Sequence, residues 1–424
     1  MRYINIAHPE QIVSFSEALV LGLGQNQGLF FPERLEPFKV IQGLLDMEFV
    51  QRSAKILEYL VEPAMPVDEL NESVVAAFNF PLRLKKVSDQ VHAMELFHGP
   101  SLAFKDFGAR FMAECLARIS VEKRVTILTA TSGDTGAAVA QAFYGQPGIE
   151  VVVLYPQGMV TPLQEKMFCT LGGNIRTIAI QDDFDACQKL VKQSFDDLEL
   201  VETIGLNSAN SINVARLMAQ VCYYFEAVAR LPGGAEPVFC VPSGNFGNVT
   251  AGLLAHALGL PLKRMIAATN RNDTIPRFLA SGKWDPRPTV ATLTNAMDIS
   301  LPNNFPRVLE LGDRHGLPLH ELLRSVSISD DETLDAVRLL DSQGYLADPH
   351  SALAWKALTD GLDDGETGVF MCTAHPAKFR ETLEAGLNRS IPLPEELLAV
   401  AEKEVLSDVM PADFDLLRNF LLEA

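Results

Sequence analysis

The stretch that decides the fold is VTILTATSGDTGAAVAQAFYG, residues 125–145. It runs from an apolar, β-branched segment through the glycine-rich turn TSGDTG into a helical pattern. A second stretch, VFCVPSGNFGNVTAGLLAHALG at 238–259, has the same order. Nearly continuous apolar strands are typical of parallel sheets that helices cover on both faces. The two units therefore predict an α/β architecture with mostly parallel sheets.

The same alternation of apolar runs and helical patterns continues from about residue 85 onward. We expect four further strands, at EVVVLY (150–155), NIRTIAI (174–180), KRMIAAT (263–269) and GVFMCT (368–373). Helical patterns lie between them, at FDACQKLVKQSF (184–195) and VARLMAQVCYYFEAVARL (214–231). The segment 271–307 is rich in Pro, Asn and Thr and has little periodicity, which is typical of a functional loop.

The first 80 residues have a different pattern, mostly helical with one glycine-rich turn, GLGQNQG at 22–28. This turn misses G-x-G-x-x-G by one residue and does not follow a strand, so we interpret it as an ordinary turn. The chain also has no G-x-x-x-x-G-K-[ST] motif, which disfavours a P-loop nucleotide-binding protein.

Charge and composition exclude several classes of protein. The 424 residues carry 54 acidic and 35 basic side chains, and a net charge of −19 argues against a nucleic acid or an anionic membrane as partner. No apolar run is long enough to span a bilayer and no signal-peptide core is visible, so we expect a cytoplasmic protein. The six cysteines and eight histidines lack metal-ligand spacing; we expect reduced, buried cysteines and no metal site.

Both glycine-rich turns are candidate anion sites. Small residues let the backbone approach a ligand, and the following helix N-terminus offers unpaired N–H groups with a favourable dipole. A single turn of this kind is a weak signal, because tight turns between strand and helix need glycine in any case. Two of them, both at carboxyl ends of strands where open α/β sheets bind ligands, favour a phosphate or carboxylate site.

A third candidate anion site is NSANSINVARL, residues 207–217, just before a long helical pattern. Asn210 or Ser211 is expected as the N-cap, and Arg216 then lies early in the helix, where its side chain points back toward the cap. Such an arginine can grip a phosphate, although taken alone it is more often a surface residue.

One lysine stands out in HGPSLAFKDFGARFM, residues 98–112. If Pro100 and Ser101 begin a helix, a core stripe forms on one face, made of Phe104, Phe107 and Phe111. Asp106 and Arg110 are spaced to pair with each other. Lys105 is then left without a local carboxylate, on a face that it shares with small or apolar residues, namely Gly108, Ala109 and Met112.

A cation on such a face has two interpretations. Its ammonium can extend to water, which is the common case for a lysine. Alternatively, desolvation lowers its pKa and makes it an amine nucleophile suited to Schiff-base chemistry. The two anion-binding turns favour the second interpretation, because together with an amine they suit pyridoxal phosphate, an aldehyde that carries its own phosphate.

Five motifs in this order and spacing resemble one enzyme family: HGPSLAFKDFGARF, TATSGDTGAAVA, LNSANSIN, VPSGNFGN and TAHPAKF. The chain resembles the threonine synthases in their longer bacterial and fungal form, and the likeness extends from QGLFFP to the irregular NDTIPRFL and NAMDISLPNNFPR segments. These are fold-type II pyridoxal-phosphate enzymes, similar to the tryptophan synthase β subunit. The resemblance implies two three-layer α/β domains with the cofactor between them: a large domain (81–115 and 216–424), a small domain (116–215) and a mainly helical N-terminal subdomain (1–80).

The resemblance also implies roles for individual residues. Lys105 matches the Schiff-base lysine, and Thr373 matches the hydroxyl residue that faces the pyridine nitrogen. The loop that cradles the cofactor phosphate matches Ser243, Gly244, Asn245, Phe246 and Gly247. The substrate carboxylate would be received by Thr131, Ser132 and Thr135. The substrate phosphate would be gripped by Asn210, Ser211 and Arg216.

Asp134 departs from the pattern of many fold-type II enzymes, which have an asparagine that contacts the phenolic oxygen of the cofactor. A carboxylate beside a phenolate would be repelled. Asp134 is therefore expected at the cofactor either protonated, sharing a proton, or turned away.

The implied reaction converts O-phospho-L-homoserine and water to L-threonine and phosphate. Lys105 would move the α proton, and Arg216 would position the leaving phosphate. The alternatives are another lyase of the same fold type, such as a related phospho-lyase or a dehydratase, and, outside this class, a non-catalytic ligand-binding relative or a nucleotide-binding protein. We expect a monomer or a homodimer, which the sequence does not distinguish.

Overall fold

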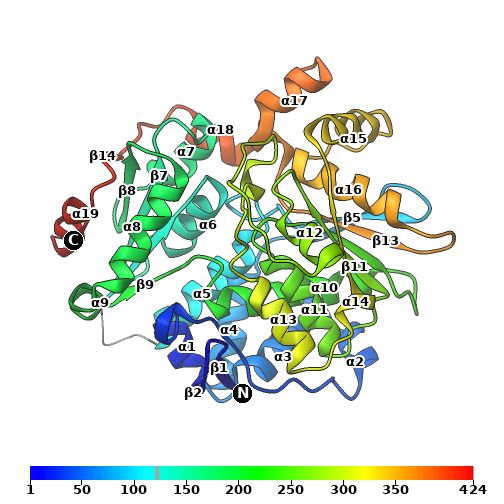
Figure 1. The fold of residues 1–424 in the computed structure, drawn as a ribbon, viewed down its shortest axis with the longest axis horizontal. Coiled ribbons are helices and arrows are strands. Elements are labelled where there is room, and N and C mark those ends of the chain that lie inside the picture. Colours follow the sequence, from blue (N-terminus) through cyan, green and yellow to red (C-terminus); the bar gives the residue numbers. More distant parts are fainter. Residues whose placement is uncertain (120–123, 424) are drawn as a thin grey trace.

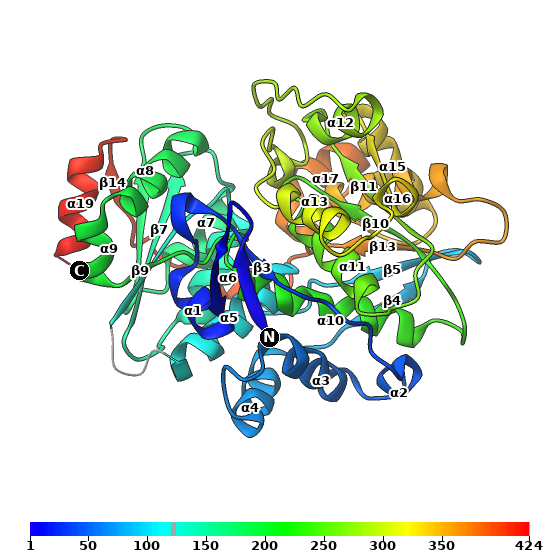
Figure 2. The ribbon, with the colours of Figure 1, turned by 60° about the horizontal axis from the view of Figure 1, so that its bottom comes forward.

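The two strand-turn-helix units form as predicted, in two different sheets. The first is strand β6 (Val125–Ala130) followed by helix α6 (Asp134–Phe143), and the second is β10 (Val238–Pro242) followed by α11 (Gly247–Ala257). The computed structural model describes residues 1–119 and 124–423. In it the two sheets are the centres of two lobes, which lie side by side in Figures 1 and 2.

The large lobe is built on a six-stranded sheet with the order β12-β11-β10-β13-β5-β4. Besides β10, its strands are β4 (Arg83–Lys86), β5 (Val91–Glu95), β11 (Arg264–Thr269), β12 (Leu323–Ser327) and β13 (Gly368–Cys372). All neighbours are parallel except β4 and β5. Helix α16 (Pro349–Gly361) packs on the central strands, and α11 and α10 (Val214–Arg230) lie on the opposite side in Figure 1. The result is one three-layer domain.

The small lobe has a fully parallel five-stranded sheet with the order β14-β8-β7-β6-β9. Its other strands are β7 (Ile149–Pro156), β8 (Ile175–Ile180), β9 (Leu206–Asn207) and β14 (Asp408–Met410). Helices α6 and α7 (Pro162–Cys169) contact the sheet. A second apolar core joins the sheet to α8 (Phe184–Asp196), α9 (Leu198–Ile204) and α19 (Phe414–Leu422).

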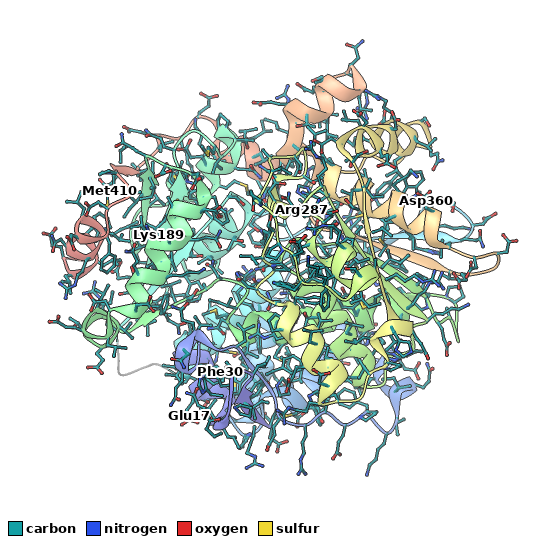
Figure 3. All side chains as sticks on the ribbon, viewed as in Figure 1. Glu17, Phe30, Lys189, Arg287, Asp360 and Met410 are labelled. Atoms are coloured by element: carbon teal, nitrogen blue, oxygen red, sulfur yellow. The ribbon has the colours of Figure 1, made fainter. Side chains whose placement is uncertain are left out.

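The C-terminal segment lies on a different lobe from the one expected. We expected all of 216–424 in the large domain, but β14 pairs with β8, and Figure 3 shows Met410 at the outer edge of the small lobe. Leu417 and Leu421 of α19 are fully buried in the small-lobe core. Helix α18 (Glu395–Ala401) also contacts α7. Burial of these apolar side chains explains why the chain returns to this lobe.

The four further predicted strands and the helices α8 and α10 are observed within one or two residues of their expected ends. The segment 271–307 is less irregular than expected. It contains α12 (Thr274–Ser281), a short turn of helix η2 (Asn295–Met297) and the start of α13 (Phe305–Asp313). The remaining helices of the large lobe are α14 (Leu319–Leu322), α15 (Asp330–Ser342), η3 (Pro376–Phe379) and α17 (Arg380–Leu387).

The N-terminal region contains a small sheet that we did not predict. Strands β1 (Arg2–Asn5), β2 (His8–Ser14) and β3 (Phe30–Pro32) form an antiparallel sheet in the order β2-β1-β3. Helices accompany it, as expected for this region: α1 (Phe15–Leu21), α2 (Ile41–Leu45), α3 (Phe49–Val61) and α4 (Val67–Ala77). The short η1 (Gln25–Gln27) lies within the turn predicted at 22–28. In Figure 2 the sheet lies in front of the junction between the lobes. None of the described helices is both long and apolar enough to span a bilayer.

Candidate active site

A cavity of about 580 Å³ lies between the lobes and is lined by both glycine-rich turns. All fourteen residues that we proposed for the site line it: Lys105, Thr131, Ser132, Asp134, Thr135, Asn210, Ser211, Arg216, Ser243, Gly244, Asn245, Phe246, Gly247 and Thr373. The fold therefore brings together residues from five separate parts of the chain.

All six cysteines are buried and free, as expected.

Lys105 is the first residue of α5 (Lys105–Ile119), so the prediction that Pro100 and Ser101 begin the helix was wrong. Leu102 has a φ of 55°, a left-handed conformation that no α-helix contains. The turn before the helix is held by the Asp106 carboxylate, which accepts a hydrogen bond from the Ser101 N–H at 2.9 Å. Lys105 thus lies at a helix start, with its side chain partly exposed to the cavity.

The Lys105 ammonium makes no ion pair in the described part of the chain, although the Asp134 carboxylate of another helix acts on its pKa. Burial lowers the pKa of Lys105 to about 8, the charge of Asp134 opposes this shift, and Arg216 and Lys378 add to it. The amine therefore loses its proton much more readily than an exposed lysine, whose pKa is about 10.4. This is the property that a Schiff-base lysine needs.

The predicted pair between Asp106 and Arg110 does not form. Arg110 instead donates to the Ala76 and Ala77 carbonyls and to Asn79 Oδ1, at the C-terminal end of α4. Carbonyl groups at a helix C-terminus attract a guanidinium, which explains this choice. Asp106 is fully buried, and burial raises its pKa to about 6 against the opposing effect of the hydrogen bond from the Ser101 N–H.

The turn after β10 has free hydrogen-bond donors. The structure shows no acceptor within the described residues for the N–H groups of Gly244, Asn245, Phe246 or Gly247. Gly244 is needed for close packing, because a Cβ there would lie 2.7 Å from the Met297 Cα. Phe246 has a φ of 60° and directs the turn into α11. Four unpaired N–H groups at a helix start form a cradle for an anion.

The turn after β6 has a similar arrangement. The Thr131 hydroxyl accepts hydrogen bonds from the N–H groups of Gly133 (2.9 Å) and Gly136 (2.7 Å), and so holds the turn together. The N–H groups of Ser132, Asp134 and Thr135 have no acceptor among the described residues. The turn therefore offers a second anion a set of backbone donors, to which side-chain hydroxyls can add.

Asp134 is ionised and paired with Lys378, so of the three states expected for it the protonated one is not observed. Lys378 of η3 lies 2.5 Å from Asp134 Oδ1, and its side chain is completely buried. Burial alone would raise the pKa of Asp134, but Lys378 and then Lys105 outweigh it and hold the pKa at about 2. Lys378 belongs to the TAHPAKF motif, yet its contact with α6 exists only in the folded chain.

The third anion site is arranged around the start of α10. The N-cap is Asn213, whose side chain accepts from the Ala215 N–H, and not Asn210 or Ser211 as predicted. Asn210 instead pairs with Thr129, and Ser211 Oγ accepts from Asn245 Nδ2 at 2.7 Å. Because their side chains bond across the site, they are not available to cap the helix.

Arg216 lies in the first turn of α10, as predicted, but it is not a surface residue. Only 2% of it is exposed, and its Nη1 donates to the Ala209 carbonyl at 2.6 Å. Its Nε has no partner among the described residues, although the side chain lines the cavity. Burial lowers the pKa of Arg216 to about 10, so the group keeps its charge at neutral pH. A buried guanidinium with an unused donor is suited to an anionic ligand.

Sequence reasoning missed three further residues near the cavity: Lys378, His350 and Asp298. His350 and Asp298 line the cavity wall, and burial raises the pKa of Asp298 to about 6 despite hydrogen bonds from Thr292. The only signal for His350 was DPHS at 348–351, which is typical of an ordinary helix start.

Comparison with known proteins assigns the chain to a family. A family model described as "Pyridoxal-phosphate dependent enzyme" matches residues 77–373, and models of the threonine synthase N terminus and C-terminal region match 2–78 and 351–421. Threonine synthase from Haemophilus influenzae is 58% identical over 100% of both chains. The chain belongs to the threonine synthase family. The Escherichia coli threonine synthase is 56% identical, over 100% of this chain and 99% of that one.

Solved threonine synthase structures agree with this assignment. The crystal structure from Escherichia coli matches with a TM-score of 0.96 at 56% identity, over 100% of both chains. The pyridoxal-phosphate-bound threonine synthase from Brucella melitensis matches with a TM-score of 0.94 at 31% identity, over 100% of this chain and 99% of that one. The expected fold-type II architecture is confirmed, and the protein is a pyridoxal-phosphate-dependent enzyme.

The residues present fit this cofactor. A phosphate needs several fixed donors, which the unpaired N–H groups of 244–247 provide at the start of α11. An aldehyde needs an amine that loses its proton readily, which Lys105 provides. Thr373 follows β13 and lines the same cavity, so its hydroxyl can face a ring seated between these two groups.

Proposed function

We propose that the protein converts O-phospho-L-homoserine and water to L-threonine and phosphate, the last step of threonine biosynthesis. The observation that carries this proposal is Arg216, a buried cation with an unused donor, in the same cavity as the lysine amine. A dehydratase acting on free serine or threonine would have no phosphate for this cation to bind. Such a cation is suited to a substrate that loses phosphate.

The cofactor would be held by three groups of this chain: the Lys105 amine, the N–H groups of 244–247 and the Thr373 hydroxyl. When bound, pyridoxal phosphate supplies an electron sink that makes protons of the substrate carbon chain acidic. Thr373 is neutral, so it leaves the pyridine nitrogen largely unprotonated. These residues set the position and the electronic state of the ring.

The substrate would be held at two ends. Its carboxylate is suited to the turn after β6, through the N–H groups of 132, 134 and 135 and the hydroxyls of Ser132 and Thr135. Its phosphate is suited to Arg216, together with Asn210 and Ser211. Holding both anionic ends orients the carbon chain between them, close to the lysine amine.

Lys105 would move the protons. Its lowered pKa lets the free amine accept a proton from the α carbon and return it near neutral pH. Gly108, one turn later in α5, lies against the backbone of Arg216, where an added Cβ would be 2.8 Å from the Arg216 carbonyl oxygen. This close approach of α5 and α10 keeps the proton-transferring amine and the phosphate-binding cation in a fixed relation.

The assay that tests the proposal measures threonine and phosphate released from O-phospho-L-homoserine. Equal amounts of the two products are expected from the wild type, and Lys105→Ala should lose turnover and the visible absorption of the bound cofactor. Lys189→Ala, an exposed lysine of α8, is the matched control. Phosphate release without threonine would indicate a related phospho-lyase instead. We further propose that the enzyme works in the cytoplasm as a monomer or homodimer.

A further inference from the structure

The imidazole of His350 is a buried polar group that the roles proposed above leave unused. His350 is the second residue of α16 and lines the cavity, with 3% of its surface exposed. Its Nε2 has no hydrogen-bond partner among the described residues. Because buried polar atoms in proteins are nearly always paired, an unpaired one at a cavity wall indicates a ligand group.

Asp348 fixes the orientation of this imidazole. One Asp348 oxygen accepts from both the His350 N–H and His350 Nδ1, each at 2.9 Å, and the other accepts from Ser351 Oγ. The Phe379 ring packs on the imidazole, with the ring centroids 4.8 Å apart. With Nδ1–H held by the carboxylate, Nε2 is the ring nitrogen left for a ligand.

The pair of Asp348 and His350 is also connected to Thr373, the residue expected at the pyridine nitrogen. Ser351 Oγ accepts a hydrogen bond from the Thr373 N–H at 3.3 Å, so Asp348, Ser351 and the end of β13 form one network. His350 and Thr373 line the same cavity. The imidazole therefore lies at the wall of the cavity that the cofactor is expected to occupy, beside the residue expected at its pyridine nitrogen.

The charged groups around His350 show which ligand atom lacks a donor. Charged groups reach the cavity region from several other elements: Lys105 from α5, Asp134 from α6, Arg216 from α10, Asp298 from the segment after η2, and Asp183 and Asp185 at the start of α8. Lys378 of η3 pairs with Asp134. Asp134 is ionised and pairs with Lys378, so it can only accept hydrogen bonds. The phenolic oxygen of pyridoxal phosphate is an acceptor as well, and it requires a donor other than Asp134.

We propose that His350 binds the phenolic oxygen of the cofactor through one proton shared between Nε2 and that oxygen, with Asp348 as a positioning residue. The proposal rests on the site residues proposed above. It gives Thr373 and His350 separate roles at two polar atoms of one ring.

The test compares the wild type with His350→Phe, His350→Gln and Asp348→Asn. The measurements are the dissociation constant of pyridoxal phosphate and the pH titration of the visible band of the bound cofactor. His350→Phe should weaken cofactor binding roughly tenfold and move the titration midpoint upward by about one pH unit, because the phenolate loses a donor. His350→Gln, whose amide can donate, should return both the dissociation constant and the midpoint most of the way to the wild-type values. Asp348→Asn should give values between those of the wild type and His350→Phe.

The matched control is His315→Gln. His315 Nε2 is also buried without a partner among the described residues, but His315 packs on Phe31 and does not line the cavity. The proposal is overturned if His350→Phe leaves both the dissociation constant and the midpoint unchanged while the wild type makes threonine. A fall in apoprotein Tm with neither cofactor measurement changed would show a structural role only, and would also overturn it. A wild type that bound pyridoxal phosphate but made no threonine would contradict the proposed function alone.

Discussion

Lys378 Nζ lies 2.5 Å from the Asp134 carboxylate, and the same ammonium donates to the Ser101 carbonyl at 2.8 Å. One buried side chain thus joins three segments: η3 after β13, the start of α6 in the small lobe, and the turn before Lys105. The pair crosses between the lobes at the cavity. The positive charge of Lys378 keeps the Asp134 carboxylate ionised.

Removing the Lys378 charge should destabilise the protein strongly. Lys378→Met leaves Asp134 buried and unpaired, which should lower the free energy of unfolding by about 3–5 kcal/mol in urea denaturation of the apoprotein. The double variant Asp134→Asn with Lys378→Met removes both charges and should recover much of this loss. Lys356→Met breaks a more exposed pair with Asp360 and should cost less than about 1 kcal/mol. Equal losses in the two lysine variants would contradict the role given to the buried pair.

Covalent attachment of pyridoxal phosphate to Lys105 should follow the lowered pKa of this amine. The unprotonated amine reacts, so the attachment rate should rise about tenfold per pH unit below the pKa of about 8 and level off above it. Stopped-flow absorbance of the apoprotein from pH 6 to 10 measures this profile. A rate that kept rising to pH 10 would show an ordinary lysine pKa.

Arg216→Ala should separate substrate binding from cofactor binding. Loss of a charged hydrogen-bond donor should lower kcat/KM for O-phospho-L-homoserine by roughly 10- to 100-fold, with the cofactor dissociation constant nearly unchanged. Inhibition by inorganic phosphate should weaken in parallel. Arg83→Ala, on the exposed face of β4, serves as control. If Arg216→Ala lost the cofactor first, the phosphate-binding role would be wrong.

Gly244→Ala should weaken cofactor binding by changing the turn after β10. The new Cβ would lie 2.7 Å from the Met297 Cα and 3.0 Å from its carbonyl oxygen, so the two loops would have to separate. The cradle of N–H groups would then lose its spacing, and we expect at least a roughly tenfold weaker affinity for pyridoxal phosphate in a fluorescence titration. Gly233→Ala, where a Cβ meets nothing within 4 Å, should bind as the wild type does.

Arg307 should hold the N-terminal region onto the site. This fully buried guanidinium donates to the Phe30 carbonyl at 2.9 Å, to the Ile212 carbonyl at 2.7 Å and to Asn304 Oδ1 at 2.7 Å. Arg307→Lys cannot make all these bonds, so residues 28–32 should exchange amide hydrogens faster, with a loss of about 2–3 kcal/mol in stability. Unchanged exchange in this segment would contradict the anchoring role.

Local patterns were enough for much of the fold and for the chemistry of the site. The glycine-rich turns follow apolar strands directly, so both parallel sheets and both anion cradles could be predicted from short stretches. Lys105 could be recognised as an unpaired amine because no carboxylate lies within one helical turn that could pair with it. The N-terminal sheet was missed because β1 and β3 are short and their pairing joins residues 2–5 to 30–32.

Other features depend on contacts between distant segments. The predicted pair between Asp106 and Arg110 followed from helical spacing, but the carbonyl groups at the end of α4 bind Arg110 more favourably. The predicted N-caps Asn210 and Ser211 bond to other parts of the site instead. In both cases a partner far away in the sequence replaced the local one.

The sequence by itself determined the α/β class, and it was enough to propose the two glycine-rich turns as anion sites and Lys105 as the nucleophile, because each depends on residues that are neighbours along the chain. Only the tertiary structure decided that Asp134 is ionised, that His350 lines the cavity with a free Nε2 and that β14 joins the small sheet. These features arise from charges and strand edges that are remote in sequence. Their energies depend on distance and burial, which exist only after the chain has folded.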